Sequence, residues 1–197
     1  MLLGHLFGGG SPRDDLSDQL VEVSLLFRRE PAVKVPEAGA LGKIFGGFGK
    51  EYAADRAVAV LQAAGIASGY VNLGGDLRVI GPRPDGRGWA LGIQHPRDAQ
   101  ASIAGIELKS GALTTSGDYE RYMDIAGTRY CHILDPRSGW PVRHWQSVSV
   151  IAPVCLAAGA LSTIAMLKGA DAPEFLNAQR VPWLAVDADG QVQRAGI

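Results

Sequence analysis

Three short polar loops, each leaving an apolar run, carry the residues best suited to chemistry. They are Asn72–Asp76, Ser116–Tyr119 and His132–Pro136. Glycines let a backbone approach a ligand closely, while Asp, Ser and His side chains supply fixed polar contacts. Three such loops in the middle of one chain indicate a site built on strand ends. Each loop taken alone is also explained by an ordinary turn.

Two further segments have side chains or amides that suit a ligand. The run from Gly46 to Lys50 places glycine N–H groups and a lysine at a helix N-terminus, which favours an anion. It does not fit the P-loop pattern, because Ile44 stands at the first glycine position and Glu51 replaces the Ser or Thr that binds Mg²⁺. Ser162 and Thr163 lie in an Ala-rich run, where such hydroxyls usually bond back to a helix carbonyl.

Hydrolase and zinc chemistry are not favoured. Ser116, His132 and Asp135 have the residue types of a catalytic triad, but the chain has no G-x-S-x-G elbow. No Cys/His cluster has zinc-ligand spacing, and a lone His in an apolar run is more often structural than a ligand. Cys131 and Cys155 lie in apolar contexts and are expected to be buried thiols, although a disulfide stays open.

The totals exclude further function classes. The 197 residues fit one domain over residues 1–197 that can bury a core. A net charge of −1 does not favour nucleic acid or an anionic membrane as a partner. No run approaches the ~18 apolar residues of a transmembrane segment. Because Met1–Gly10 lacks the basic start of a signal peptide, the chain as written is expected to be cytoplasmic.

Hydrophobic spacing predicts the elements that position these loops. Helical spacing runs from Tyr52 to Ala64 and ends at Gly65, and alternating apolar runs predict strands before and after it. Because strands and helices do not alternate strictly, we expect an α+β fold with mixed or antiparallel sheets packed with helices. Further helices are predicted near Ser11, over 154–168 and over 172–179, and strands over 21–27, 32–35, 69–73, 77–80, 90–93, 102–108, 113–115, 121–125, 130–134, 147–151, 183–186 and 191–193.

Together the motifs resemble those of the ApbE-type FAD:protein FMN transferases. Members of that family carry L-G-G-I-A-K-G-Y-A-V-D, N-L-G-G-D, T-S-G-D-Y, H-I-I-D-P-x-T-G-x-P and A-D-A-L-S-T-A. The corresponding segments are Phe45–Asp55, Asn72–Asp76, Thr115–Tyr119, His132–Pro141 and Ala158–Ile164. One such match would be weak, but five in the family's order and approximate spacing are specific.

The resemblance implies a T-fold-like flavin transferase core and a reaction. Such enzymes bind FAD, use Mg²⁺ on its pyrophosphate, and pass FMN to a Thr or Ser hydroxyl of a target flavoprotein, with release of AMP. A divalent ion in this chemistry neutralises the pyrophosphate oxygens. The implied partners are FAD and the acceptor flavoprotein, and a homodimer or a partner that completes the site stays open.

The resemblance also assigns roles to residues of this chain. It places metal ligation at the Gly47 carbonyl, the Thr163 hydroxyl and the position of Gly159, and catalysis at His132 and Asp118. The residues that it places around FAD are Lys50, Asn72, Gly74, Gly75, Asp76, Ser116, Gly117, Tyr119, Ile133 and Asp135.

Four departures from the family pattern raise an alternative. Gly159 stands where the metal-binding Asp belongs, Glu51 replaces the Gly after Lys50, and Ile44 stands where many members have Asp. By this resemblance the sequence is also expected to start partway through the family pattern, after its usual N-terminal segment. Glu51 is a candidate to replace the lost carboxylate, but spacing in the sequence does not show that it does. The alternative is therefore a catalytically impaired, ApbE-like FAD-binding module with weak affinity for Mg²⁺.

Overall fold

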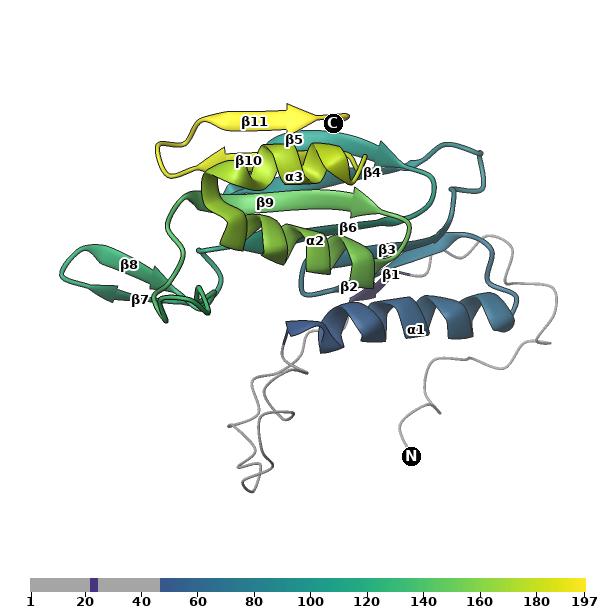
Figure 1. Cartoon of the computed structure of the whole chain (residues 1–197). Coiled ribbons are helices and arrows are strands. Elements are labelled where there is room, and N and C mark those ends of the chain that lie inside the picture. The colour runs from purple at the N-terminus through teal and green to yellow at the C-terminus, as the bar shows by residue number, and fades with distance from the viewer. Residues whose placement is uncertain (1–21, 25–46) are drawn as a thin grey trace, which may run out of the picture.

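The computed structural model of the chain describes residues 22–24 and 47–197 (Figure 1). The helix predicted near Ser11 and the strand predicted over 32–35 lie outside these residues. Of the strand predicted over 21–27, the structure describes Glu22–Ser24 as β1.

The helices form where the sequence predicts them. Helix α1 spans Gly49–Ala63 and buries Ala54 and Val58, and the chain leaves it through Gly65 at a φ of 89°. A positive φ suits glycine, which carries no Cβ. Helix α2 spans Cys155–Lys168, the short 3₁₀ turn η3 spans Gly169–Asp171, and α3 spans Ala172–Ala178.

The strands form one large sheet and two hairpins. The large sheet has the order β1-β2-β3-β6-β9-β10-β11, in which β1 pairs parallel with β2 and every other pairing is antiparallel. The α+β class with mixed and antiparallel sheets is thus confirmed. The strands are β2 Gly69–Leu73, β3 Asp76–Gly81, β4 Trp89–His95, β5 Asp98–Leu108, β6 Ala112–Gly117, β7 Tyr122–Ile125, β8 Thr128–Cys131, β9 Trp145–Ala152, β10 Trp183–Asp187 and β11 Val192–Ala195.

Most strand bounds lie within two residues of the prediction, and two differ by more. The strand predicted over 130–134 ends at Cys131, because the chain then turns so that the Asp135 N–H donates to the Trp140 carbonyl. Strand β5 begins at Asp98, earlier than the predicted 102, after shifts in the β4–β5 register near Gln94. The first difference matters for the site, since it leaves His132 on a loop rather than inside a strand.

The large sheet is covered on both faces. Helices α2 and α3 pack on one face, against β9 and the side of β10 that presents Trp183 and Ala185. The β4–β5 hairpin packs on the other face, against β3, β6 and the side of β10 that presents Leu184 and Val186. Helix α1 lies over β2 and β3 and beside α2 (Figure 1).

The β7–β8 hairpin projects from this body (Figure 1). Its strand β7 leaves Tyr122, Met123 and Ile125 exposed. Within the described residues, no helix has both the length and the apolar character that a membrane crossing requires.

Candidate functional site

The turn between β2 and β3 is fastened to the first turn of α1. The Asn72 side chain accepts a hydrogen bond from the N–H of Gly75 at 2.9 Å, and Gly74 and Gly75 have φ values of 58° and 91°. Lys50 Nζ donates to the Gly74 carbonyl at 3.2 Å and forms an ion pair with Asp76 Oδ2 at 3.0 Å. Glycine suits both turn positions, because positive φ strains other residues. The structure therefore brings Lys50 and the Asn72–Asp76 loop together.

Asp76 is a buried carboxyl in this cluster, with 3% of its surface exposed. The pKa of Asp76 is raised to about 6, chiefly by burial; Lys50 opposes the rise and the neighbouring Glu51 carboxyl adds to it. Among the described residues, its Oδ2 atom has no hydrogen-bond partner beyond the ion pair with Lys50. A buried carboxylate in this position gains from additional positive charge, because desolvation penalises the ionised form.

Glu51 lies directly against Gly159 of α2. A Cβ atom added to Gly159 would fall 2.7 Å from Glu51 Cγ and 2.9 Å from Glu51 Oε1. Gly159 is buried, so the Glu51 side chain occupies the space that a side chain at position 159 would need. The carboxyl group missing from α2 is thus matched by one that reaches across from α1.

Hydroxyl groups connect α2 to the end of β6. Ser116 Oγ lies 2.8 Å from Ser162 Oγ and 3.0 Å from Thr163 Oγ1, and the Ser162 hydroxyl donates to the Gly159 carbonyl at 3.0 Å. Thr163 lies one helical turn after Gly159, so both positions share a face of α2. Ser162 makes the local carbonyl bond that its place in a helix predicts, but it also reaches the candidate site.

Asp118 is held by arginines that the sequence did not single out. Its two oxygens accept from Arg97 Nη1 at 2.6 Å and Nη2 at 2.8 Å, and Arg129 Nη1 lies 3.6 Å from Oδ1. These three residues line a small cavity of about 160 Å³ together with Arg143 and Gln146. Asp118 is therefore a paired anion that orients guanidinium groups. No spacing rule connects residues of these separate segments, so only the fold reveals this group.

Gly117 allows the Tyr119 ring to fold back over the end of β6. A Cβ at Gly117 would fall 2.5 Å from a carbon of that ring and 3.2 Å from the Gln146 carbonyl oxygen. Burial raises the pKa of Tyr119 to about 12. The phenol thus stays protonated at neutral pH and retains its O–H donor.

His132 uses one ring nitrogen in a hydrogen bond to the backbone. Its Nδ1 lies 3.2 Å from the Arg121 carbonyl, which can only accept, so Nδ1 carries the proton and Nε2 holds a lone pair. Burial lowers the pKa of His132, and the positive charges of Arg121 and Lys50 contribute to this shift. The imidazole is therefore neutral at pH 7 and within electrostatic range of Lys50.

Ile133, Asp135 and Gly47 lie apart from these contacts. Ile133 is buried in the hydrophobic core beneath α2. Asp135 forms a local pair with Arg137 at 2.8 Å, which closes its own turn. Gly47 is exposed at the start of the second described segment, with no atom within 4 Å of an added Cβ.

Asp55 joins α1 to α2, a role that the sequence prediction did not assign to it. Its Oδ1 accepts from the Cys155 N–H at 2.9 Å, its Oδ2 accepts from the Leu156 N–H at 3.0 Å, and Arg78 Nε lies 3.2 Å from Oδ1. Val154 provides no side-chain cap for α2, so an acid from α1 caps that helix. Its place at the end of the Phe45–Asp55 motif was the available signal.

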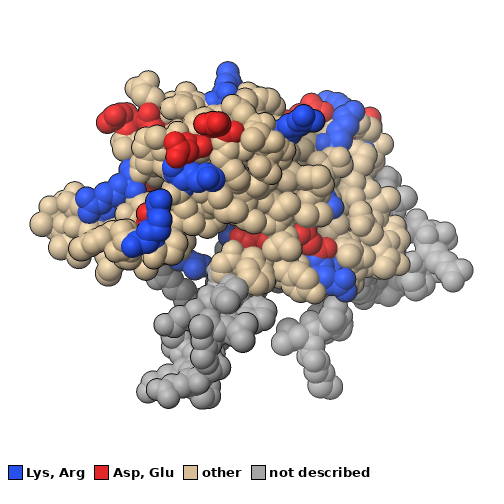
Figure 2. All heavy atoms as spheres, in the orientation of Figure 1, with Lys and Arg blue, Asp and Glu red and all other residues tan. Residues whose placement is uncertain are grey.

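The site surface is mixed in charge. Figure 2 shows a hollow where the projecting hairpin meets the body near the start of α1, with basic and acidic side chains on its rim. Among the residues that the structure describes, no three His, Cys, Asp or Glu side chains gather as a metal centre. A metal here would thus depend on two carboxylates, a hydroxyl and ligand oxygens rather than on a complete protein cage.

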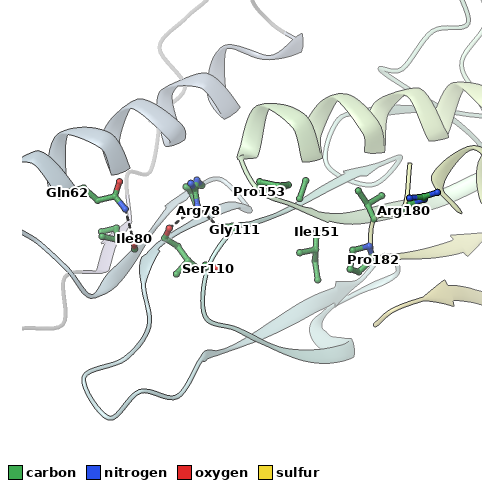
Figure 3. A pocket seen from close by; sticks show the side chains of 12 residues that line it. Gln62, Arg78, Ile80, Ser110, Gly111, Ile151, Pro153, Arg180 and Pro182 are labelled. Atoms are coloured by element: carbon green, nitrogen blue, oxygen red, sulfur yellow. Dashed lines mark hydrogen bonds between the residues drawn. The ribbon is translucent and has the colours of Figure 1, made fainter. Parts of the chain in front are cut away.

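A second cavity, of about 490 Å³, is lined by a different set of residues (Figure 3). Gln62 Nε2 donates to the Ile80 carbonyl at one side of it, and Arg78 Nη1 donates to the Gly111 carbonyl. None of the residues assigned to FAD, metal or catalysis lines it.

The chain is similar to known proteins in sequence and in fold. The family model described as "ApbE family" matches residues 33–185. The FAD:protein FMN transferase of Escherichia coli K12 is 36% identical over 123 residues, which make up 61% of this chain and 35% of that protein. The crystal structure of the ApbE protein of Thermotoga maritima has 39% identity and a TM-score of 0.73, covering 77% of this chain and 50% of that one.

The apo structure of the Pseudomonas stutzeri flavinyl transferase ApbE has 33% identity and a TM-score of 0.66, covering 77% of this chain and 49% of that one. The chain thus spans about half the length of these structures and about a third of the E. coli protein. The family model covers well over half of the chain, and the identities to both structures exceed the level at which only a fold is shared. The chain belongs to the ApbE family.

Proposed function

We propose that this chain acts as a Mg²⁺-dependent FAD:protein FMN transferase, which moves FMN to a Thr or Ser hydroxyl of a target flavoprotein and releases AMP. The observation that carries the proposal is the position of Lys50 and Glu51. These adjacent residues of α1 contact the β2–β3 loop and α2, respectively. Relatives named for this activity support it.

The reaction needs a base for the acceptor hydroxyl. The hydroxyl oxygen forms a bond to the phosphorus of the FMN half of FAD, the bond from that phosphorus to the bridging oxygen breaks, and AMP leaves. The hydroxyl proton passes to His132 Nε2, which carries the free lone pair of a neutral ring. Because both Asp118 oxygens are held by Arg97, we assign Asp118 a positioning role beside this step.

Charge neutralisation falls to Lys50 and to the arginines on Asp118. Lys50 Nζ is a compact charge held at the Gly74 carbonyl, and Lys50 stands in the first turn of α1. A pyrophosphate placed there meets one ammonium and the N-terminal end of that helix. The Arg97 and Arg129 guanidinium groups offer a second cationic position at the end of β6.

The side chains present fit a magnesium ion. Mg²⁺ is usually held by one or two carboxylates together with substrate phosphates and water. Glu51 and Asp76 supply two neighbouring carboxyls, and Thr163 offers a hydroxyl on the same face of α2 as Gly159. Among the described residues, the Lys50 ion pair alone balances the buried Asp76 Oδ2 atom. When bound, the ion supplies positive charge for the pyrophosphate oxygens.

A direct assay tests the function. The chain is mixed with FAD, Mg²⁺ and an acceptor flavoprotein of the E. coli relative, with that relative as the positive control. We expect the acceptor to gain the mass of FMN and AMP to appear in equal amount. If the relative modifies the acceptor and this chain does not, the proposal fails. Quenching of FAD fluorescence by the chain in that case would support the FAD-binding module without transfer.

A further inference from the structure

We propose that Glu51 supplies the carboxylate ligand of the divalent cation site that Gly159 lacks, so that a ligand on α2 has been exchanged for one on α1. The inference rests on the proposed function for the presence of a cation. It goes beyond that function by assigning the ligand to a residue that the family pattern does not use.

The contact between the two positions carries the inference. The Glu51 carboxyl reaches the Cβ position of Gly159, with Oε1 2.9 Å and Cδ 3.1 Å from it. An aspartate at position 159 would start its side chain from that same point. The Glu51 carboxyl therefore lies close to where a carboxyl at position 159 would begin, although it arrives from the opposite helix.

The two departures from the family pattern are reciprocal. The motifs described above have glycine after the lysine and aspartate at the position of Gly159, whereas this chain has Glu51 and Gly159. An aspartate at position 159 together with Glu51 would bring two carboxyls into one space, and a Cβ within 3.0 Å of Glu51 atoms forces the side chain to move. Glycine at both positions would leave neither carboxyl. The observed pair keeps one carboxyl and avoids the overlap.

The neighbours of Glu51 suit a cation ligand. The Asp76 carboxyl is beside it, and Lys50, the adjacent residue, is occupied by Asp76 and the Gly74 carbonyl. Thr163 follows Gly159 by one helical turn, so its hydroxyl projects from the same face of α2. The competing explanation is that Glu51 only fills the space above Gly159. Volume and charge separate the two explanations, because glutamine fills the same space without the charge.

The experiment measures Mn²⁺ binding by the paramagnetic resonance signal of the free ion, with and without ADP as an unreactive pyrophosphate. The variants are Glu51→Gln, Gly159→Asp and the double exchange Glu51→Gly with Gly159→Asp. Glu174→Gln, an exposed acid on α3, is the matched control. Circular dichroism and melting curves establish that each variant is folded.

We expect Glu51→Gln to weaken Mn²⁺ binding by at least about tenfold. Replacing even a residue that only supports a metal ligand usually lowers metal affinity by that factor. The double exchange should restore binding, and Glu174→Gln should match the unchanged chain. Equal Mn²⁺ affinity for Glu51→Gln and the unchanged chain overturns the inference, as does a folded double exchange that binds no better than Glu51→Gln. Absence of Mn²⁺ binding by the unchanged chain in both conditions also overturns it.

The readout separates this inference from the proposed function. Mn²⁺ binding that depends on Glu51, in a chain that transfers no FMN, would reject the function and keep the ligand assignment. FMN transfer by the unchanged chain, together with an unaltered Mn²⁺ affinity in Glu51→Gln, would keep the function and reject the ligand assignment.

Discussion

Single residues of the site owe their chemistry to one or two contacts each. His132 donates from Nδ1 to the Arg121 carbonyl, which leaves Nε2 as its acceptor. Asp118, by contrast, has both oxygens engaged by Arg97. Of these two loops, one thus holds a group ready to accept a proton and the other a group that is already paired. His132 rather than Asp118 is therefore the residue to test as a general base.

We expect His132→Gln to lower FMN transfer by roughly 10²–10⁴-fold, the usual contribution of a general base. The fall in rate on the acid side of the pH profile should also disappear, because glutamine does not titrate. The assay is the rate of FMN mass gain by the acceptor between pH 5 and 8. His144→Gln is the control, since that ring packs on Trp145 outside the site. An unchanged acid limb in His132→Gln would remove His132 from the proton transfer.

Helices α1 and α2 are joined by a cap that crosses between them. Asp55 of α1 accepts from the first two N–H groups of α2 and pairs with Arg78 of β3. Without the Asp55 carboxylate, the first two N–H groups of α2 lose their acceptor and the half-buried Arg78 guanidinium loses its ion pair. The position of Gly159 relative to Glu51 depends on this junction, because it ties the helix that carries one residue to the helix that carries the other.

Asp55→Ala should therefore lower the free energy of unfolding by about 2–4 kcal/mol, combining a lost cap with unsatisfied partners. Urea unfolding followed by circular dichroism measures the change. Asp171→Ala is the matched control, since Asp171 stands at the start of α3 without a side-chain cap bond and should cost little. If Asp55→Ala and Asp171→Ala lower the free energy of unfolding equally, the cross-helix cap adds no stability beyond that of an acid without a cap bond.

The sequence predicts the elements better than their contacts. Apolar spacing and the stop at Gly65 locate α1, and alternation locates β2 at the observed residues 69–73. These patterns depend on neighbours within one element, so a sequence displays them. The bounds of β8 were missed because its end depends on a bond between Asp135 and Trp140 across a turn.

The resemblance identifies residues of the candidate site, but it predicts only some of the contacts between them. The resemblance brought Lys50 and Asp76 into one group, and the structure pairs them at 3.0 Å. The contact of Glu51 with Gly159 was beyond the sequence, because it depends on how α1 packs on α2. Asp55 and the start of α2 are likewise 100 residues apart. Metal ligation and catalysis by these residues stay predictions until the assays above are done.

At the scale of the whole molecule, the large sheet separates the core beneath α2 and α3 from the core beneath the β4–β5 hairpin, and a third cluster lies under α1. Trp183 and Ala185 face the helices, while Leu184 and Val186 face the β4–β5 hairpin. Burial on both sides explains why this strand is apolar at successive positions instead of alternating. Cys131 lies in the core beneath α2 and α3 at 4% exposure, and Cys155 lies in the cluster under α1 at 0% exposure.

Both thiols should resist Ellman's reagent in the folded protein at pH 8. Burial raises the pKa of each, and the thiolate is the reactive form. In guanidinium chloride, both cysteines of the chain should react. Because the folded pKa of Cys155 exceeds the unfolded value, its contribution to stability is complete below the unfolded pKa and declines as pH rises above about 8.5. Rapid labelling of a thiol in the native chain would contradict the packing described.

The Asp55 cap also gives the protein an internal reporter. The amides of Cys155 and Leu156 donate to a side chain on another helix rather than to their own. Amide hydrogens exchange with solvent when their bonds open, so exchange at these two positions measures how often α1 and α2 separate. That rate can be followed in the intact protein without a substrate. Slower exchange on addition of Mn²⁺ would show the cation holding the two helices together.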